Sequence, residues 1–459
     1  MKLSRTFLTL SVPAMLAFAA CSTVEEAREA QKPENRLQGE RTVAFSEFGY
    51  ADGMALSLSD LENIAFVANP QIFQARQQVV SARLAVQDVR ADYLPTVDGE
   101  ASYTRQTRNE TSSGSFRSYG SDRVALSMDL LLWDFGKTEA KLAQAVAQLL
   151  AAEKNLLSAE NLVRYNVRKA YFELRRSIEL NVVAEQAVEQ YREHLDQMRV
   201  RRAEGTGTKY ACTKAEVDYN NAVLDQISKA NDVKTARANL NLALGFAESP
   251  AYGLGGHVMG TFEEDAETLL ALAREREPGL AALVAQEKAA SAYVDKTVAD
   301  LYPSLGLSVS AAFTGDDLDM PKVWNLIGAG TLTQNVFNGG RNVRAIENAV
   351  AQLRVARSKV AAYEQDLYSK ITTAVLTLTR AKKQYEVALV SERAAQENFE
   401  IVTEQFNVGK ASSLDRTDAQ VSLTEARAAT VSAEYDYREA VAAIAYLVAT
   451  DPADQLVGD

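Results

Sequence analysis

The sequence has few of the residues on which many enzyme and metal sites depend. It contains two histidines and two cysteines among 459 residues, and these four side chains lie far apart along the chain. No His/Cys cluster has the spacing of metal ligands, and we find no phosphate-binding glycine loop, GxSxG elbow or HExxH pair. The sequence therefore predicts no metal and no cofactor. An exported hydrolase would need a nucleophile or carboxylate pair that no motif supplies.

Basic charge is also scarce. The chain has 49 Lys and Arg against 61 Asp and Glu, and its formal net charge is −12. Because no basic stripe is present to displace counterions from phosphates, nucleic acid is not an expected partner. Proline and glycine are few, with 9 and 23 residues, and 47% of the residues are hydrophobic. The chain is therefore expected to fold around a large core.

A short apolar run at the N-terminus predicts export. Lys2 and Arg5 precede FLTLSVPAMLAFAA, which is too short for a permanent transmembrane helix and ends in small residues. Residues 1–20 are therefore interpreted as a signal peptide. Cys21 follows directly in a stretch that resembles a bacterial lipobox, so we expect acylation of this cysteine, for example by palmitate. A stray cysteine after an ordinary cleavage site is the alternative, and residues 21–53 would form the lipid-anchored tether.

The sequence contains an internal duplication. The first half carries the series NP, DYLP, WDFGK and a glycine in RRAEGTGT, and the second half carries EP, DLYP, FNGGR and a glycine in FNVGKASS. Successive landmarks are separated by 25 and 25, 41 and 37, and 69 and 69 residues, which leaves little room for chance. We therefore predict tandem repeats over residues 54–250 and 251–459. The landmarks are Pro70, Pro95, Gly136 and Gly205 in the first repeat and Pro278, Pro303, Gly340 and Gly409 in the second.

Each repeat is expected to contain long helices and one strand hairpin. Residues 137–203 are rich in Ala and Leu and contain no Pro or Gly, which predicts a helix roughly 100 Å long at ~1.5 Å per residue. Alternation of apolar and polar residues with period two predicts the strands. The further helices are expected over 71–93, 212–246 and 414–449, and the hairpins over about 95–134 and about 303–337.

One predicted strand has a wholly apolar face, formed by Val124, Leu126, Met128, Leu130 and Leu132. Apolar residues outside and polar residues inside are typical of a transmembrane barrel, in which about 10 residues per strand suffice to cross. Four strands cannot close a barrel, and an open edge in lipid is costly. Several copies of the chain would therefore share one barrel. A coiled-coil stalk with a water-facing β cap is the soluble alternative.

The ordered set of motifs resembles the TolC-like outer-membrane efflux proteins over nearly the whole mature chain. The set comprises the duplicated plan, the NP and LP pairs, WDFGK, FNGGR, and VGxxSxxDxxDAQ at 408–420. The resemblance implies an α+β membrane protein that forms a homotrimer, with a twelve-stranded transmembrane barrel and a periplasmic tunnel of long α-helical hairpins. It implies a location in the outer membrane of a Gram-negative bacterium, extending into the periplasm. The implied partners are outer-membrane lipid, a periplasmic adaptor protein and an inner-membrane transporter.

Two acids in the stretch LDRTDAQ are candidate site residues. Asp415 and Asp418 are three residues apart, so both point to one side of a helix. One interpretation is helix capping, with Ser412 as the cap and Asp415 completing a capping box. The equivalent positions 204 residues earlier are Ala211 and Lys214, so that helix starts without either acid. The resemblance implies a periplasmic gate, an acidic ring that favours cations and raises some carboxylate pKa values.

The resemblance also implies the positions of the tips of the helical hairpins. Better known members of the family hold the entrance shut with a tyrosine and an arginine, and the matching positions here are Phe406 and Ala411. The arginines at 199, 201 and 202 would either pair with acids of a neighbouring helix or form a solvated face. The turns, with a possible adaptor contact, comprise Gly205, Thr206, Gly409 and Lys410.

These observations favour an outer-membrane exit duct of a tripartite efflux system, without enzymatic activity, that passes drugs or other small molecules. The outer-membrane component of type I protein secretion is one alternative. A non-conducting, lipid-anchored periplasmic coiled-coil scaffold is another. The transported substrate does not follow from the sequence, because neither a Met-rich lining nor a His cluster indicates metal export.

Overall fold

A computed structural model describes residues 23–24, 27–28, 45–49, 53–109, 116–246, 250, 252–256, 260, 262, 265–316 and 323–450. The expected signal peptide, Cys21 and most of the expected tether lie outside these residues. The chain divides into two compact units, and each takes residues from both halves of the sequence. Unit 1 comprises Met1–Pro70, Asn166–His257 and Ala394–Val431, and unit 2 comprises Gln71–Tyr165, Val258–Arg393 and Ser432–Asp459.

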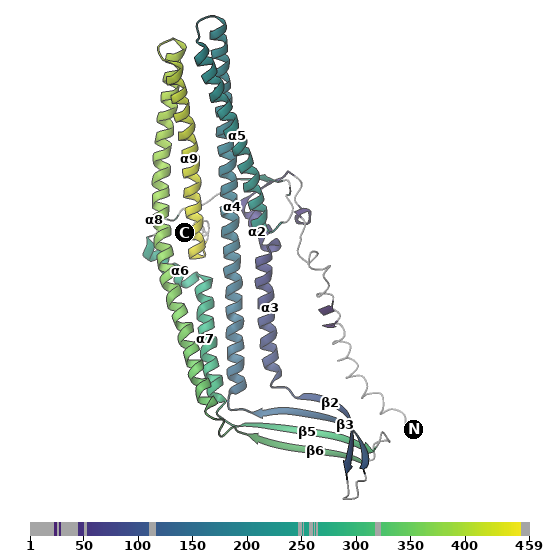
Figure 1. Ribbon diagram of the computed structural model, residues 1–459. Helices are drawn as coiled ribbons and strands as arrows, with labels where there is room; N and C mark the ends of the chain where they lie inside the picture. Colours follow the sequence, from purple (N-terminus) through teal and green to yellow (C-terminus); the bar gives the residue numbers. More distant parts are fainter. Residues whose placement is uncertain are drawn as a thin grey trace. The chain divides into compact units, whose positions relative to one another are not determined.

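Both halves of the sequence contain the same main elements in the same order (Figure 1). The predicted 67-residue helix over 137–203 is confirmed, and the ends of the other predicted helices differ by at most three residues. The first half contains α2 Leu58–Ala68, α3 Pro70–Ala91, β2 Thr96–Asn109, β3 Phe116–Trp133, α4 Lys137–Ala203 and α5 Lys209–Leu244. The second half contains α6 Ala266–Arg276, α7 Pro278–Ala299, β5 Ser304–Asp316, β6 Val323–Thr333, α8 Arg341–Asn407 and α9 Ser413–Val448.

The WDFGK and FNGGR motifs supply the N-terminal caps of the two 67-residue helices. At the start of α4, Asp134 Oδ2 accepts a hydrogen bond from the backbone N–H of Thr138 at 2.7 Å. At the start of α8, Asn338 Oδ1 accepts one from the backbone N–H of Arg341 at 3.0 Å. Asp134 and Asn338 are equivalent in the duplication, and two residues with positive φ follow each of them. Each motif is therefore a sharp turn that ends in a helix cap.

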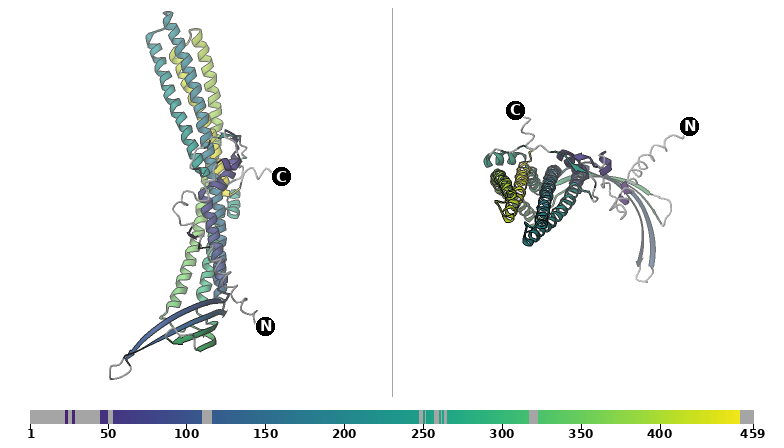
Figure 2. Two further views of the ribbon diagram at one scale, coloured as in Figure 1. Left: turned by 90° about the vertical axis from the view of Figure 1, so that its right-hand side faces the viewer. Right: turned by 90° about the horizontal axis from the view of Figure 1, so that it is seen from above.

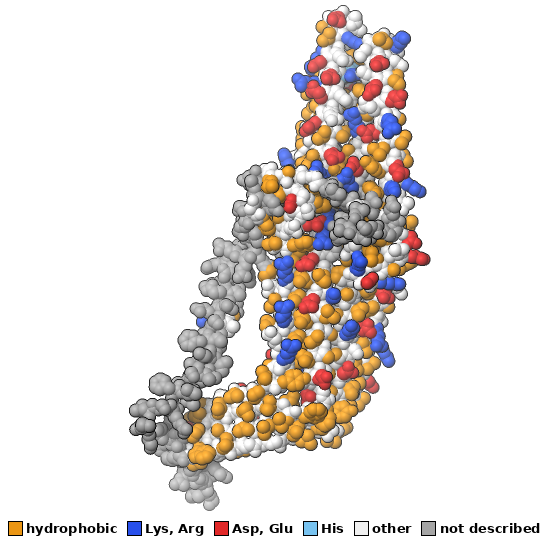
Figure 3. Space-filling view, turned by 180° about the vertical axis from the view of Figure 1, so that it is seen from behind, with side chains coloured by type: hydrophobic (Ala, Val, Ile, Leu, Met, Phe, Trp, Pro, Cys, Tyr) orange, Lys and Arg blue, Asp and Glu red, His pale blue; other side chains and the backbone are white. Residues whose placement is uncertain are grey.

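The four long strands form one antiparallel sheet within unit 2, in the order β2-β3-β5-β6 (Figures 1 and 2). Apolar residues of neighbouring strands are in register, and Figure 3 shows hydrophobic side chains gathered over the strands. One such row contains Ala101, Val124, Phe313 and Trp324, and the next contains Gly99, Leu126, Ala311 and Leu326. The opposite face carries polar residues, among them Asp98, Ser127 and Ser310. The predicted separation into an apolar and a polar face therefore holds for β2, β3 and β5. Strand β6 is less regular, because Val323 and Ile327 lie on the polar face opposite Thr314 and Ser310.

The sheet of the single chain is open. Strands β2 and β6 are its two edges, and neither has a second partner strand within the described residues. Every residue of β6 is exposed, including Trp324 at 70% and Leu326 at 64%. The chain alone therefore leaves two strand edges and a large apolar surface uncovered.

A mixed core fixes the helix connections in unit 1. Leu61 of α2 and Leu244 of α5 are fully buried. Arg168 of α4 and Glu62 of α2 form a buried ion pair at 2.6 Å. A short parallel pairing of β1 (Ala55–Leu56) with β4 (Gly253–Leu254) ties the segment before α2 to the connection between the repeats.

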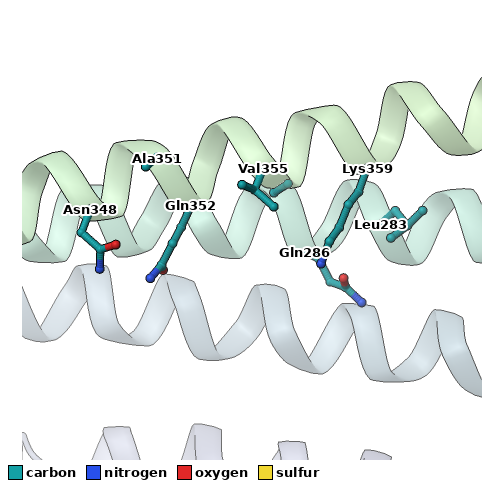
Figure 4. A pocket seen from close by; sticks show the side chains of 8 residues that line it. Leu283, Gln286, Asn348, Ala351, Gln352, Val355 and Lys359 are labelled. Carbon is teal, nitrogen blue, oxygen red and sulfur yellow. The ribbon is translucent and has the colours of Figure 1, made fainter.

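Unit 2 has a separate apolar core, in which α6 packs against α8 and α9. Its fully or nearly fully buried members include Leu269 of α6, Ile371 of α8 and Val441 of α9. A cavity of about 450 Å³ lies between α7 and α8 in the same unit (Figure 4). Its lining mixes amide, lysine and aliphatic side chains: Leu283, Gln286, Asn348, Ala351, Gln352, Val355, Ala356 and Lys359.

Candidate functional site at the helix turns

Two tight turns, both in unit 1, connect α4 to α5 and α8 to α9. Gly205 has φ of +79° and Gly409 has φ of +76°, a backbone conformation that favours glycine. The backbone N–H groups of Thr206 and Lys410 donate to carbonyl oxygens of the preceding helix at 2.9 and 2.8 Å. These bonds satisfy carbonyl groups that the end of a helix leaves free. All four residues predicted for the tip turns therefore lie in the turns.

Asp415 forms the capping box that the sequence suggested as one interpretation. Its Oδ2 accepts hydrogen bonds from the backbone N–H of Ser412 at 2.8 Å and from Ser412 Oγ at 2.7 Å. The backbone N–H of Asp415 donates to Ser412 Oγ at 3.2 Å. These side-chain and backbone hydrogen bonds from Ser412 hold the pKa of Asp415 below its usual value. The equivalent helix α5 is capped by Thr208 alone, which accepts from the N–H of Ala211 at 3.1 Å.

Both candidate acids are exposed on the first turns of α9, whereas Arg416 and Thr417 between them are buried. Capping therefore explains Asp415 within the chain, but it does not involve the side chain of Asp418. Two exposed carboxylates on one side of a helix leave that side negatively charged. The upward pKa shift expected for an acidic ring needs the charges of neighbouring copies, and it stays a prediction.

Phe406 is buried beneath the two turns. Only 3% of its surface is exposed, and its ring belongs to a small core with Leu195 and Met198 of α4 and Cys212 of α5. Phe406 belongs to α8, in the second half of the sequence, whereas the other residues of this core belong to α4 and α5, in the first half. Ala411 packs at the margin of the same core. The two positions that depart from the family pattern thus contribute apolar packing.

Arg201 contacts the ring of Phe406. The sequence predicted either a pair with an acid of a neighbouring helix or a solvated face, and it did not predict this contact. Its guanidinium carbon lies 4.1 Å from the ring centroid, and its Nη2 donates to the carbonyl oxygen of Phe406 at 3.4 Å. At this distance the ring face attracts the cation. Arg199 pairs instead with Asp196 of its own helix at 3.2 Å.

Polar side chains join α4 to α9 below the turns, and we call this contact the α4–α9 seam. The α4 residues are spaced by about one helical turn, and this i, i+4 spacing is the only signal that the sequence offers. None of these contacts was predicted, because their partners lie more than 200 residues away. The pairs are Gln186 with Arg427 at 3.2 Å, Gln190 with Gln420, and His194 with Ser413 at 3.0 Å.

The described residues contain no group of three or more His, Cys, Asp or Glu side chains that could hold a metal ion. None of the described helices combines the length and the apolar character of a membrane-spanning helix. The arrangement at the turns therefore consists of charges, hydrogen bonds and aromatic packing, which can position helices and attract or repel ions.

Comparison with protein families gives one match that covers most of the chain. A family model described as "Outer membrane efflux protein" matches residues 62–246 and 269–450. The outer membrane efflux protein BepC of Brucella suis biovar 1 is 26% identical over 373 residues, covering 80% of this chain and 79% of BepC. The toluene efflux pump outer membrane protein TtgI of Pseudomonas putida is 25% identical over 452 residues, covering 91% and 92%.

Solved structures show the same fold. The Campylobacter jejuni CmeC outer membrane channel superposes with a TM-score of 0.75 at 18% identity, covering 87% of this chain and 88% of CmeC. The outer membrane protein VceC from Vibrio cholerae superposes with a TM-score of 0.73 at 18% identity, covering 86% and 96%.

Proposed function

The chain belongs to the outer membrane efflux protein family, and from this premise we propose that it forms the outer-membrane exit duct of a tripartite efflux system. In this role it receives drugs or other small molecules from a periplasmic adaptor and an inner-membrane transporter. The family is one of transport channels, so the duct itself supplies a path and a gate, and the energy for transport comes from the transporter.

The four-stranded sheet of unit 2 carries this proposal. One of its faces carries apolar rows, and the other is polar along β2, β3 and β5, as expected for a barrel wall between lipid and water. Unpaired backbone groups at the edges of β2 and β6 would be very unfavourable in lipid. Pairing β6 of one copy with β2 of the next removes both edges. With three copies, the number that the family resemblance implies, the closed barrel has twelve strands.

The exposed helix turns are the proposed contact for the adaptor. Beside Gly205–Thr206 and Gly409–Lys410, two large apolar side chains face solvent: Tyr210 is 78% exposed and Val408 is 70% exposed. Their side chains could pack against a partner protein that binds over the turns. We therefore place the adaptor at this end of α4, α5, α8 and α9.

Asp415 and Asp418 are the proposed periplasmic gate. In a trimer they would supply six carboxylates around a narrow opening, and such a ring attracts cations and repels anions. Asp415 combines this role with its capping box. Both side chains are exposed in the single chain, which supports the proposal.

Single-channel recording in planar bilayers tests the duct and the gate together. We expect a small, cation-selective conductance from the purified protein, and a loss of selectivity or a larger conductance in the Asp415→Ala/Asp418→Ala variant. The control Asp225→Ala/Asp232→Ala removes two exposed acids of α5 and should leave the current unchanged. If the conductance and selectivity were the same in the gate variant as in the parent, both aspartates would have only a structural role, such as helix capping. A folded, membrane-inserted trimer without channels in any variant would indicate a duct that stays shut without its partners, or the scaffold.

We further propose that Cys21 carries the lipid anchor, although this residue lies outside the described part of the chain. An acyl chain would add membrane affinity to a barrel that already spans the membrane. The mass of the N-terminal peptide of the mature protein checks this directly. Acylation should disappear in Cys21→Ser, and an unmodified peptide in the parent protein would contradict the anchor.

A further inference from the structure

A single buried imidazole links α4 to α8 and α9 in unit 1. His194 is 3% exposed, and its Nε2 lies 3.0 Å from Ser413 Oγ at the start of α9. Its ring meets Phe406 of α8 edge to face, with 5.7 Å between the centroids. The second ring nitrogen, Nδ1, is buried and has no hydrogen-bond partner. His194 of α4 thus contacts both α8 and α9, and its Nδ1 is buried without a hydrogen-bond partner.

The charges that face His194 come from three helices. Arg201 of α4 and Arg416 of α9 are cations, and Arg416 is 6% exposed with its guanidinium near the rings of Phe399 and Phe406. Asp218 of α5 is a facing carboxylate; its Oδ1 is paired with Lys214 at 2.6 Å, whereas its Oδ2 is buried without a hydrogen-bond partner. A proton on His194 would therefore place a third positive charge beside two buried or partly buried cations.

The environment opposes that proton. Burial, and then the charge of Arg416, lower the pKa of His194 to about 4, while Asp218 offsets part of this shift. The protonated ring carries N–H donors on both nitrogens, and the one at Nδ1 is buried without an acceptor in the closed seam. The closed arrangement of the seam therefore favours a neutral imidazole.

We propose that the α4–α9 seam is a proton-sensitive latch and that His194 is its proton-binding site. Protonation of His194 releases the end of α4 from α8 and α9, and deprotonation restores the contact with Ser413 and Phe406. This inference goes beyond the duct proposed above and does not depend on it, because it concerns contacts within one chain.

The direction of the pH effect follows from the two states of the imidazole. Once the seam opens, His194 is solvated and its pKa returns towards the usual 6.5, whereas in the closed seam the pKa is about 4. The open state binds the proton more tightly, so the closed state is favoured above pH 6.5 and loses stability as the pH falls from 6.5 to 4. Between pH 7.5 and pH 5 the opening equilibrium should rise by up to about 30-fold.

Hydrogen exchange of the full-length protein in detergent, followed by mass spectrometry at pH 7.5 and pH 5.0, measures this opening. Rates are first corrected for the intrinsic pH dependence of amide exchange. We expect protection to fall by about 10- to 30-fold at pH 5.0 in peptides from the end of α4 and the start of α9. Peptides from α7, in the other unit, should keep their protection and serve as the internal reference.

Two variants separate the latch from general acid destabilisation. His194→Gln keeps a neutral side chain that can hydrogen bond to Ser413, and its protection should not depend on pH. Ser413→Ala removes the hydrogen bond but keeps the imidazole, so protection should be lower at both pH values and still fall in acid. The proposal is overturned by an acid loss in His194→Gln that equals the parent's, or by a parent without any acid loss. Protection that rises at pH 5.0 would mean that protonated His194 pairs with Asp218, and would also overturn it.

Discussion

Phe406 shows how much one side chain contributes at the helix turns. Its ring fills the small core between α4 and α5 and lies against Arg201 and His194. The sequence marks it only as an aromatic residue in a position where the family often has tyrosine. Its burial depends on α8 approaching the first hairpin, which local sequence does not specify. The residue therefore connects apolar packing, a cation–π contact and the titratable imidazole.

The substitution Phe406→Ala should loosen both turns. Truncating a fully buried phenylalanine costs about 3–5 kcal/mol, because transfer energy is lost and a cavity remains. We expect faster hydrogen exchange in residues 195–215, which contain the other members of this core. The control Tyr210→Ala changes an aromatic residue that is 78% exposed in the same region, and its effect should stay within about 0.5 kcal/mol. Equal effects of the two substitutions would contradict the packing role of Phe406.

The capping hydrogen bonds of Asp415 stabilise the start of α9 whether or not this residue also belongs to the gate. Because the hydrogen bonds from Ser412 lower its pKa in the folded state, the stabilisation that it provides is present above the usual carboxyl pKa. It is lost as the pH falls below that value and through the lowered pKa. Acid fraying of the first turn of α9 would therefore begin at a lower pH than the opening of the His194 latch.

Among the elements, the two 67-residue helices are the most fully specified by the sequence. Neither α4 nor α8 contains Pro or Gly, and both begin at the last residue of a cap motif and end at a glycine turn. Apolar residues of these helices are buried at some positions and exposed at others along their length. Propensity and capping therefore determine where each helix starts and stops, and packing determines which of its faces is covered.

The substitution Asp134→Ala should destabilise the start of α4 by about 1 kcal/mol, because it leaves the N–H of Thr138 without its acceptor. Asp134→Asn is the matched control, since asparagine caps as well as aspartate and stands at the equivalent position 338. Exchange of the first amides of α4 should accelerate only in the alanine variant. Acceleration of the same size in both variants would mean that the charge of Asp134, and not its capping bond, stabilises the helix.

For the whole molecule, the open sheet of unit 2 decides whether one chain is sufficient. Its apolar rows and its two free edges make a single chain unsuited to either water or lipid. The proposed trimer would solve both problems, because a closed barrel pairs every edge and exposes the apolar face to lipid. In that proposal the assembly completes a sheet that the single chain leaves open.

Adjacent residues on β3 test which face of the sheet meets lipid. Leu126→Arg places a charge on the apolar face, where arginine near the bilayer midplane costs about 2–4 kcal/mol. Ser127→Arg places the same charge one residue further on, on the polar face, and should be tolerated. We expect Leu126→Arg to lower the yield of membrane-inserted trimer on semi-native gels, with little change for Ser127→Arg. The reverse order would mean that the polar face is the outer one.

Much of the architecture follows from local patterns in the sequence. The duplication appears as repeated spacing, the long helices as runs free of Pro and Gly, and the strands as alternation with period two. The capping box of Asp415 and the turns at Gly205 and Gly409 are also local, since all their partners lie within a few residues. Such features depend on backbone geometry and neighbouring side chains, so they can be predicted without knowledge of the packing.

The contacts of the α4–α9 seam were decided only by the tertiary structure. His194 and Ser413 are 219 residues apart, and Gln190 and Gln420 are 230 apart. Both helices carry polar residues on several faces, so the sequence does not indicate which polar side chains will meet. Helix packing chooses one face of α4 and one of α9, and it thereby turns an isolated histidine into a buried, titratable contact between the two hairpins.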